Sequence, residues 1–86
     1  MEEPELYSAL TTIFRDVLVN DTLVLSPDLT AKQVKGWDSF KQIEILLAVE
    51  QHYGVKFHTR EVDRLENVGD LVSILRSKLS AAKKVP

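Results

Sequence analysis

The chain is 86 residues long, with 44% hydrophobic and 28% charged side chains, which is typical of one small globular domain and excludes a disordered chain. Eleven basic and thirteen acidic residues give a net charge of −2, so we expect no nucleic acid and no membrane among its partners. Cysteine is absent, and no stretch has the pattern of a signal peptide or a membrane-spanning helix. We therefore expect a monomeric cytoplasmic protein with a single domain over residues 1–86, ordered from about residue 5 to about residue 80 and frayed at both ends.

The first predicted element is an amphipathic helix of about four turns. Its apolar side chains recur at spacings of three and four residues: Leu6, Ala9, Leu10, Ile13, Phe14, Val17 and Leu18. Asn20 and Asp21 end this helix. The next segment, residues 21–37, is long for a loop without regular structure, so we expect it to be held against the helices. It contains the turn signal Ser26-Pro27-Asp28, and we expect a short helical turn near residues 29–32 and packing by Leu23, Leu25, Leu29 and Val34.

Three further helices are predicted in the second half of the chain. A helix over residues 39–53 should stop at Gly54, and residues 55–57 should be extended. Thr59 should cap a short third helix that carries Val62 and Leu65, and Asn67 should cap the last helix. The buried stripe of that last helix is Val68, Leu71, Val72, Leu75 and Leu79. The sequence therefore predicts an all-α four-helix bundle with three longer helices, one short third helix and a long loop between helices 1 and 2.

The junction Gly36-Trp37-Asp38-Ser39 precedes the most apolar helix and offers two capping schemes. Ser39-x-x-Gln42 fits a capping box, in which the serine hydroxyl caps the helix and the glutamine reaches back. Alternatively Asp38 is the cap, and Ser39 becomes the first helical residue with its hydroxyl left for solvent. A phosphate ester on that hydroxyl would be favoured by the positive end of the helix dipole. No base or second nucleophile accompanies Ser39, which favours an attachment point over a catalytic residue.

The segment from Gly36 to Glu50 resembles the phosphopantetheine-attachment segment of acyl carrier proteins, with their Asp-Ser-Leu signature present here as Asp-Ser-Phe. The order and lengths of the predicted helices match that fold over nearly the whole chain. The resemblance implies a carrier rather than an enzyme. Ser39 would receive 4′-phosphopantetheine from coenzyme A through a separate phosphopantetheinyl transferase. The terminal thiol of the arm would hold acyl or aminoacyl groups as thioesters.

The second predicted helix carries two apolar faces. Ile45, Leu46, Val49 and Tyr53 form one face, and Phe40, Ile43 and Leu47 form the other. Either the helix is buried on both sides, or the second face is exposed beside Ser39 as a docking surface. The resemblance implies that Phe40, Ile43, Glu44 and Leu47 contact partners and that acyl chains enter the bundle between the helices. We expect Ile43 to lie mostly inward, and Phe40 and Leu47 mostly outward.

The charges near Ser39 bear on the identity of the partners. Asp38, Lys41 and Glu44 complete the predicted partner surface. The resemblance implies a transferase reaction that uses magnesium, to which Asp38 would contribute. The resemblance implies an acyl-loading ligase or transferase and a ketosynthase or acyltransferase as further partners. Lys41 and the low net charge depart from the strongly acidic carriers of fatty acid synthesis. They favour a freestanding carrier for specialised products, with the pathway open among fatty acid, lipid and secondary metabolism.

Other functions fit the sequence less well. An unmodified helical interaction module, docking through Phe40, Ile43 and Leu47, is the main alternative. A small hydrolase would need a histidine folded back onto Ser39, and so short a chain leaves little room for a substrate cleft. His52 and His58 lack the helical spacing of a metal pair, so no metal site is predicted. Trp37 is expected to be a packed hinge residue, and Lys78, Lys83 and Lys84 to complement the final helix dipole.

Overall fold

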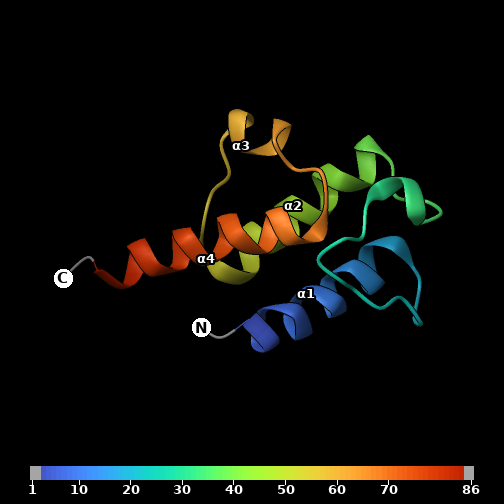
Figure 1. The fold of residues 1–86 in the computed structure, drawn as a ribbon, viewed down its shortest axis with the longest axis horizontal. Coiled ribbons are helices and arrows are strands. Elements are labelled where there is room, and N and C mark those ends of the chain that lie inside the picture. Colours follow the sequence, from blue (N-terminus) through green and yellow to red (C-terminus); the bar gives the residue numbers. More distant parts are fainter. Residues whose placement is uncertain (1–2, 85–86) are drawn as a thin grey trace.

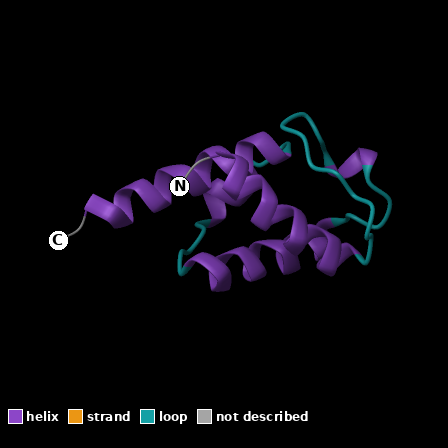
Figure 2. Cartoon of the chain, turned by 90° about the horizontal axis from the view of Figure 1, so that it is seen from below, coloured by secondary structure: helices purple, strands orange, loops and turns teal. Residues whose placement is uncertain are grey.

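The computed structural model describes residues 3–84 as a set of α-helices joined by loops, with side chains described as far as residue 80 (Figures 1 and 2). The elements in chain order are α1 (Glu3–Leu18), the 3-10 turn η1 (Ala31–Gln33), α2 (Ser39–Tyr53), α3 (Thr59–Asp63) and α4 (Val68–Lys84). In Figure 1, α1 lies at the bottom and α3 at the top, with α2 and α4 between them. The all-α prediction with one short third helix is confirmed.

Helix α1 buries one stripe, made by Leu6, Leu10 and Phe14, as its periodicity predicts. It ends in a left-handed residue, a common way to terminate a helix, with the Asn20 N–H donating to the Arg15 carbonyl at 3.0 Å. The left-handed residue is Val19, with φ of 51°, although a β-branched side chain disfavours this conformation. The helix stops at Leu18, and the left-handed residue that ends it is Val19, one residue before the predicted Asn20.

The long loop after α1 is held to the core and to the start of α4. Leu23 and Val34 are buried, while Leu25 and Leu29 pack partly against the core, as predicted. The Val68 N–H donates to the Leu29 carbonyl at 3.0 Å, which satisfies a backbone donor that lies at the helix start. Next to it, the Gly69 N–H donates to the Pro27 carbonyl at 3.0 Å. A Cβ at Gly69 would lie 3.1 Å from that carbonyl oxygen, so the close approach favours glycine. The short helical turn lies at Ala31–Gln33, slightly later than predicted.

Helices α3 and α4 differ from the prediction in two details. His58, not Thr59, is the N-cap of α3, and Leu65 lies beyond the end of that helix. Lys78 does not complement a helix dipole. Its Nζ lies 2.8 Å from Glu61 Oε1 and 5.5 Å from the centre of the Phe57 ring, so it joins α4 to α3 and to the segment before it. The side chains of Lys83 and Lys84 lie outside the described residues.

The core runs along the facing sides of α1, α2 and α4 and is closed by the loop. Asn67 caps α4 as predicted, because its Oδ1 accepts the Asp70 N–H at 2.8 Å. The predicted stripe of α4 is buried from Val68 to Leu75, and Leu79 packs partly against it. Helix α4 extends to Lys84. Residues 1–2 and 85–86 lie outside the described residues, so fraying there stays a prediction. The buried side chains are Leu6, Leu10, Phe14, Leu23, Val34, Trp37, Ile45, Leu46, Val49, Val68, Leu71, Val72 and Leu75.

Candidate functional site

Asp38, rather than Ser39, caps α2. The backbone at Asp38 is extended, and its Oδ1 accepts the N–H of Lys41 at 2.9 Å. Ser39 is therefore the first helical residue and is exposed. Among residues 3–80, no hydrogen bond engages the Ser39 hydroxyl. Of the two capping schemes that the sequence offers, the structure adopts the one that leaves this hydroxyl to solvent at the positive end of a helix.

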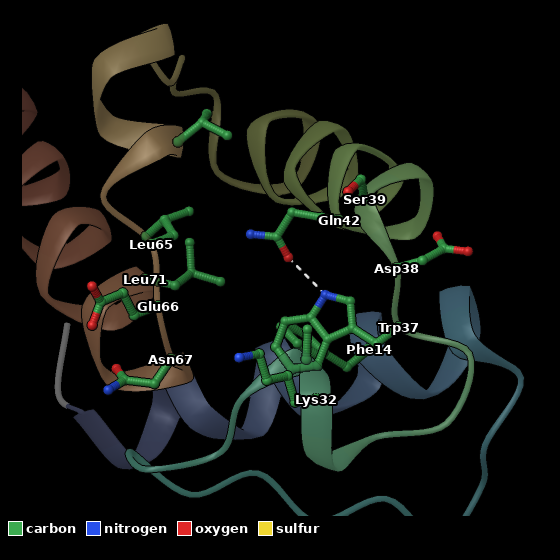
Figure 3. A pocket seen from close by; sticks show the side chains of 12 residues that line it. Phe14, Lys32, Trp37, Asp38, Ser39, Gln42, Leu65, Glu66, Asn67 and Leu71 are labelled. Carbon is green, nitrogen blue, oxygen red and sulfur yellow. Dashed lines mark hydrogen bonds between the residues drawn. The ribbon is translucent and has the colours of Figure 1, made fainter.

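Trp37 fixes the turn that presents Ser39. Its indole is buried and meets the Phe14 ring edge-on, with the ring centres 5.1 Å apart and the planes at 89°. The indole Nε1–H donates to Gln42 Oε1 at 2.7 Å (Figure 3). The predicted role of Trp37 as a packed hinge is confirmed. Gln42 does not reach back to the helix start as a capping box requires, because its side chain is held by Trp37.

A pocket of ≈ 430 Å³ opens beside Ser39 (Figure 3). Its walls come from α1, the η1 turn, the start of α2, α3 with the segment that follows it, and α4. Apolar side chains cover part of the lining, and polar and charged side chains cover the rest. The lining residues are Phe14, Ala31, Lys32, Trp37, Asp38, Ser39, Gln42, Val62, Leu65, Glu66, Asn67 and Leu71. An apolar chain can therefore be shielded there, next to the exposed Ser39 hydroxyl.

The second apolar face of α2 is exposed. Phe40, Ile43 and Leu47, here called the α2 patch, are 72%, 57% and 53% exposed. The expectation that Ile43 lies mostly inward is wrong, whereas Phe40 and Leu47 do lie outward. The reason is helical geometry: Ile43 is about 200° around the helix from the buried Ile45. Exposed apolar side chains that lie together on one face are typical of a binding surface.

Polar groups border the α2 patch. Lys41 Nζ lies 3.4 Å from Glu44 Oε2, so these two predicted partner residues form an exposed ion pair at i,i+3. Asp38 is exposed at the start of the helix. All six predicted partner residues lie at the N-cap or in the first three turns of α2, the helix that Ser39 begins: Asp38, Phe40, Lys41, Ile43, Glu44 and Leu47. Their contact with a partner stays a prediction.

Several pocket residues were missed by sequence reasoning. The sequence marks Gln42 only as a capping partner and indicates no role at the site for Lys32, Glu66 and Asn67. Glu66 and Asn67 reach the pocket from a segment far from Ser39 in the chain, and Lys32 reaches it from the η1 turn without forming a motif with Ser39, so no local pattern marks these residues. Within residues 3–80, no three His, Cys, Asp or Glu side chains lie close enough to hold a metal ion. In the described part of the chain, no helix is both long and apolar enough to cross a bilayer.

The chain is similar to a known protein family, to two relatives and to a solved structure. A family model described as a phosphopantetheine attachment site matches residues 8–75. The acyl carrier protein of Thermosynechococcus vestitus is 25% identical over 81 residues, which cover 94% of this chain and 100% of the relative. That of Thermotoga maritima is 25% identical over 75 residues, 87% of this chain and 93% of the relative. The solution NMR structure of a holo acyl carrier protein from Geobacter metallireducens superposes with a TM-score of 0.87. It is 35% identical to this chain and covers 93% of it, while this chain covers 92% of that protein.

Proposed function

The chain belongs to the acyl carrier protein family, and on that premise we propose that Ser39 is the residue that bears its phosphopantetheine arm. The protein is a non-catalytic carrier that holds acyl intermediates as thioesters. When bound, phosphopantetheine supplies the thiol on which the thioester forms. The family membership also implies a phosphopantetheinyl transferase and acyl-handling enzymes as partners.

The exposed hydroxyl of Ser39 is the observation that carries the proposal. Asp38 provides the helix cap, so the Ser39 oxygen can form an ester without removing a hydrogen bond from the fold. The position at the helix N-terminus favours the negative charge of a phosphate. Ser26, the nearest other serine of the first half, lies in the loop before Pro27, and Ser73 lies inside α4. The exposed Ser39 hydroxyl and the cap at Asp38 therefore fit a phosphopantetheine group on Ser39. During transfer, Ser39 Oγ would attack the pantetheine-bearing phosphorus of coenzyme A and pass its proton to a base that the transferase supplies. The pyrophosphate bond would break, and adenosine 3′,5′-bisphosphate would leave.

The α2 patch supports a more specific proposal about docking. Phe40, Ile43 and Leu47 offer apolar contact, and Asp38 adds an acidic group beside the attachment point. A transferase, an acyl-loading ligase, a ketosynthase or an acyltransferase would each approach Ser39 across this face. The Lys41–Glu44 ion pair reduces the negative charge of the surface. This lower negative charge supports a freestanding carrier for specialised products rather than a carrier of bulk fatty acid synthesis, whose surface would be more acidic. A cytoplasmic location and a monomeric state stay predictions.

Intact mass spectrometry tests the attachment site. The purified protein is incubated with coenzyme A and a broad-specificity phosphopantetheinyl transferase. The wild type should gain the mass of one arm, and Ser39→Ala should gain none. Ser73→Ala is the matched control, because it removes an exposed serine from α4 and should still gain one arm. A mass gain in Ser39→Ala would refute the site. A wild type that stays unmodified would favour the alternative, an interaction module that binds through the exposed α2 patch.

A further inference from the structure

We propose that Gln42 selects the cargo of this carrier. Its amide N–H groups face the pocket beside Ser39 and donate to an oxygen on the acyl chain. The pocket therefore favours oxoacyl or hydroxyacyl groups over saturated chains of the same length. This inference rests on the proposed attachment to Ser39, because that bond places the cargo beside the pocket.

The orientation of the Gln42 amide follows from its hydrogen bond with Trp37. An indole N–H can only donate, so the glutamine must offer its carbonyl oxygen, and the observed partner at 2.7 Å is Oε1. The amide nitrogen then points away from the indole. Figure 3 shows it directed toward the side of the pocket where Leu65 lies.

This orientation is held firmly because Trp37 cannot move easily. Its ring is buried against Phe14, and its backbone N–H donates to the Val34 carbonyl at 3.2 Å. A flipped Gln42 amide would bring an N–H group toward the indole N–H and leave that buried donor without an acceptor. Leaving a buried donor unpaired is unfavourable, so the flipped form is disfavoured.

The side-chain nitrogen of Gln42 carries two N–H groups that can donate hydrogen bonds to a ligand in the pocket. Between residues 3 and 80, no acceptor is hydrogen-bonded to Gln42 Nε2. Glu66 and Asn67 of the pocket lining carry side-chain acceptors but make no hydrogen bond to Gln42. Val62, Leu65 and Leu71 of the lining carry no side-chain acceptor. A saturated chain cannot accept a hydrogen bond either. An oxo or hydroxyl oxygen can, and it would replace the water that these donors lose when the chain enters the pocket. The arm also contains amide oxygens, but the donors face the inside of the pocket rather than the exposed Ser39, which favours cargo as the acceptor.

Two six-carbon cargoes, hexanoyl and 3-oxohexanoyl, test the proposal on the holo-protein. Thioester hydrolysis is measured for each and divided by the rate of the same thioester on free pantetheine. The wild type should protect the 3-oxo cargo about two- to tenfold better than the saturated one, the gain expected from one net hydrogen bond. The Gln42 side-chain amide proton should also shift in NMR spectra with the 3-oxo cargo, and not with hexanoyl or with the unloaded arm.

Two variants separate the donor role from a structural one. Gln42→Glu keeps an oxygen that can accept from Trp37 but removes the donors, and it should protect both cargoes equally. Gln51→Glu is the matched control, because it adds the same charge at an exposed position outside the pocket and should keep the preference. An equal amide shift with all three forms of the arm would make the arm the acceptor and overturn cargo selection. A preference that persists in Gln42→Glu would overturn it as well.

The proposed attachment and the proposed selection fail in different ways. If no arm is gained at Ser39, the loading reaction shows this by mass before any cargo is compared. The unmodified protein can then be titrated with free hexanoyl and 3-oxohexanoyl pantetheine thioesters. A shift of the Gln42 amide proton with the 3-oxo compound alone would uphold the selection without Ser39. Equal responses to the two compounds would refute it.

Discussion

Asp38 Oδ1 accepts the backbone N–H of Lys41 at 2.9 Å, so the residue before Ser39 does the capping and the serine does not. We expect Asp38→Ala to lower the free energy of unfolding by about 1 kcal/mol through loss of the cap. Ser39→Ala should change it by less than about 0.5 kcal/mol, as for an ordinary surface substitution. Urea denaturation of both variants measures this difference. Equal losses would mean that the serine hydroxyl also caps the helix.

The two faces of α2 should respond differently to a carboxylate. Val49 is fully buried, so Val49→Asp should unfold the domain, because an unpaired charge would enter the core. Leu47→Asp should cost at most about 1 kcal/mol, since the side chain is half exposed, while slowing loading by partner enzymes. Ile43→Asp should behave like Leu47→Asp. Thermal unfolding and loading rates test all three. If Leu47→Asp destabilises as much as Val49→Asp, the α2 patch is part of the core.

Lys41→Glu tests the charge beside Ser39, the proposed attachment residue. An acid in the first turn gains from the helix dipole, but here it would also face Glu44, so the change in stability should stay within about 0.5 kcal/mol. Loading by a malonyl transferase of fatty acid synthesis should become faster, because such enzymes bind acidic carriers. The gain should shrink as the Debye length falls from about 10 Å at 0.1 M salt to about 3 Å at 1 M. Lys56→Glu makes the same charge change outside α2, and an equal gain there would remove any special role for Lys41.

Val19 stores strain that a single substitution should release. Its φ of 51° is unfavourable for a β-branched residue, and its side chain is 85% exposed, so little packing would be lost. Val19→Gly should raise the free energy of unfolding by about 0.5–1 kcal/mol, after allowance for the flexibility of glycine in the unfolded chain. Val24→Gly is the control, since Val24 is 73% exposed and has no positive φ. That variant should be destabilised, and a loss of stability in both would show that Val19 is not strained.

Glu61 should make the domain sensitive to acid. The backbone N–H of His58 and the ammonium of Lys78 both bind its carboxylate, and they lower the pKa of Glu61 from its usual 4.5. A lowered folded pKa means that the stabilisation is complete above about pH 4.5 and is lost as the pH falls through the folded value. The stability difference between wild type and Glu61→Gln should therefore shrink from about pH 6 to about pH 3. A difference that stays constant with pH would show that the ion pair contributes nothing.

Local signals in the sequence were enough to predict most of the helices. Gly54 ends α2 in a left-handed conformation, which glycine adopts readily because it has no Cβ. Asn67 caps α4, because its side-chain oxygen can accept a backbone N–H at the helix start. The capping signals at Asp38 and Ser39 located the start of α2, but they left open which residue is the cap, and the structure assigns that role to Asp38. Ile43 differs from its prediction because its angle on the helix, about 200° from the buried Ile45, turns it to solvent, whereas the family resemblance favoured an inward position.

The pocket could not be predicted, because tertiary packing brings its walls together. Phe14, Lys32 and Leu71 lie far apart in the chain, and no spacing rule links them. The hydrogen bond between Trp37 and Gln42 also depends on the angle at which the loop enters α2. Val19 illustrates a related limit. Asn20 is the better left-handed residue on intrinsic preference, but the packing of α1 and the loop places the end of the helix one residue earlier.

The carbonyls of Pro27 and Leu29 complete the first turn of a helix that begins some forty residues later. During synthesis the N-terminal part of a chain leaves the ribosome first, so these carbonyls emerge well before their partners at Val68 and Gly69. Until those amides arrive, these two carbonyls can bond only to water, although hydrogen bonds within the loop, such as that from the Leu29 N–H to the Ser26 carbonyl, do not need α4. The nascent domain thus completes its fold only when its last helix is released. A chain arrested before that point would present Ser39, the proposed attachment residue, to a transferase on an incompletely folded domain.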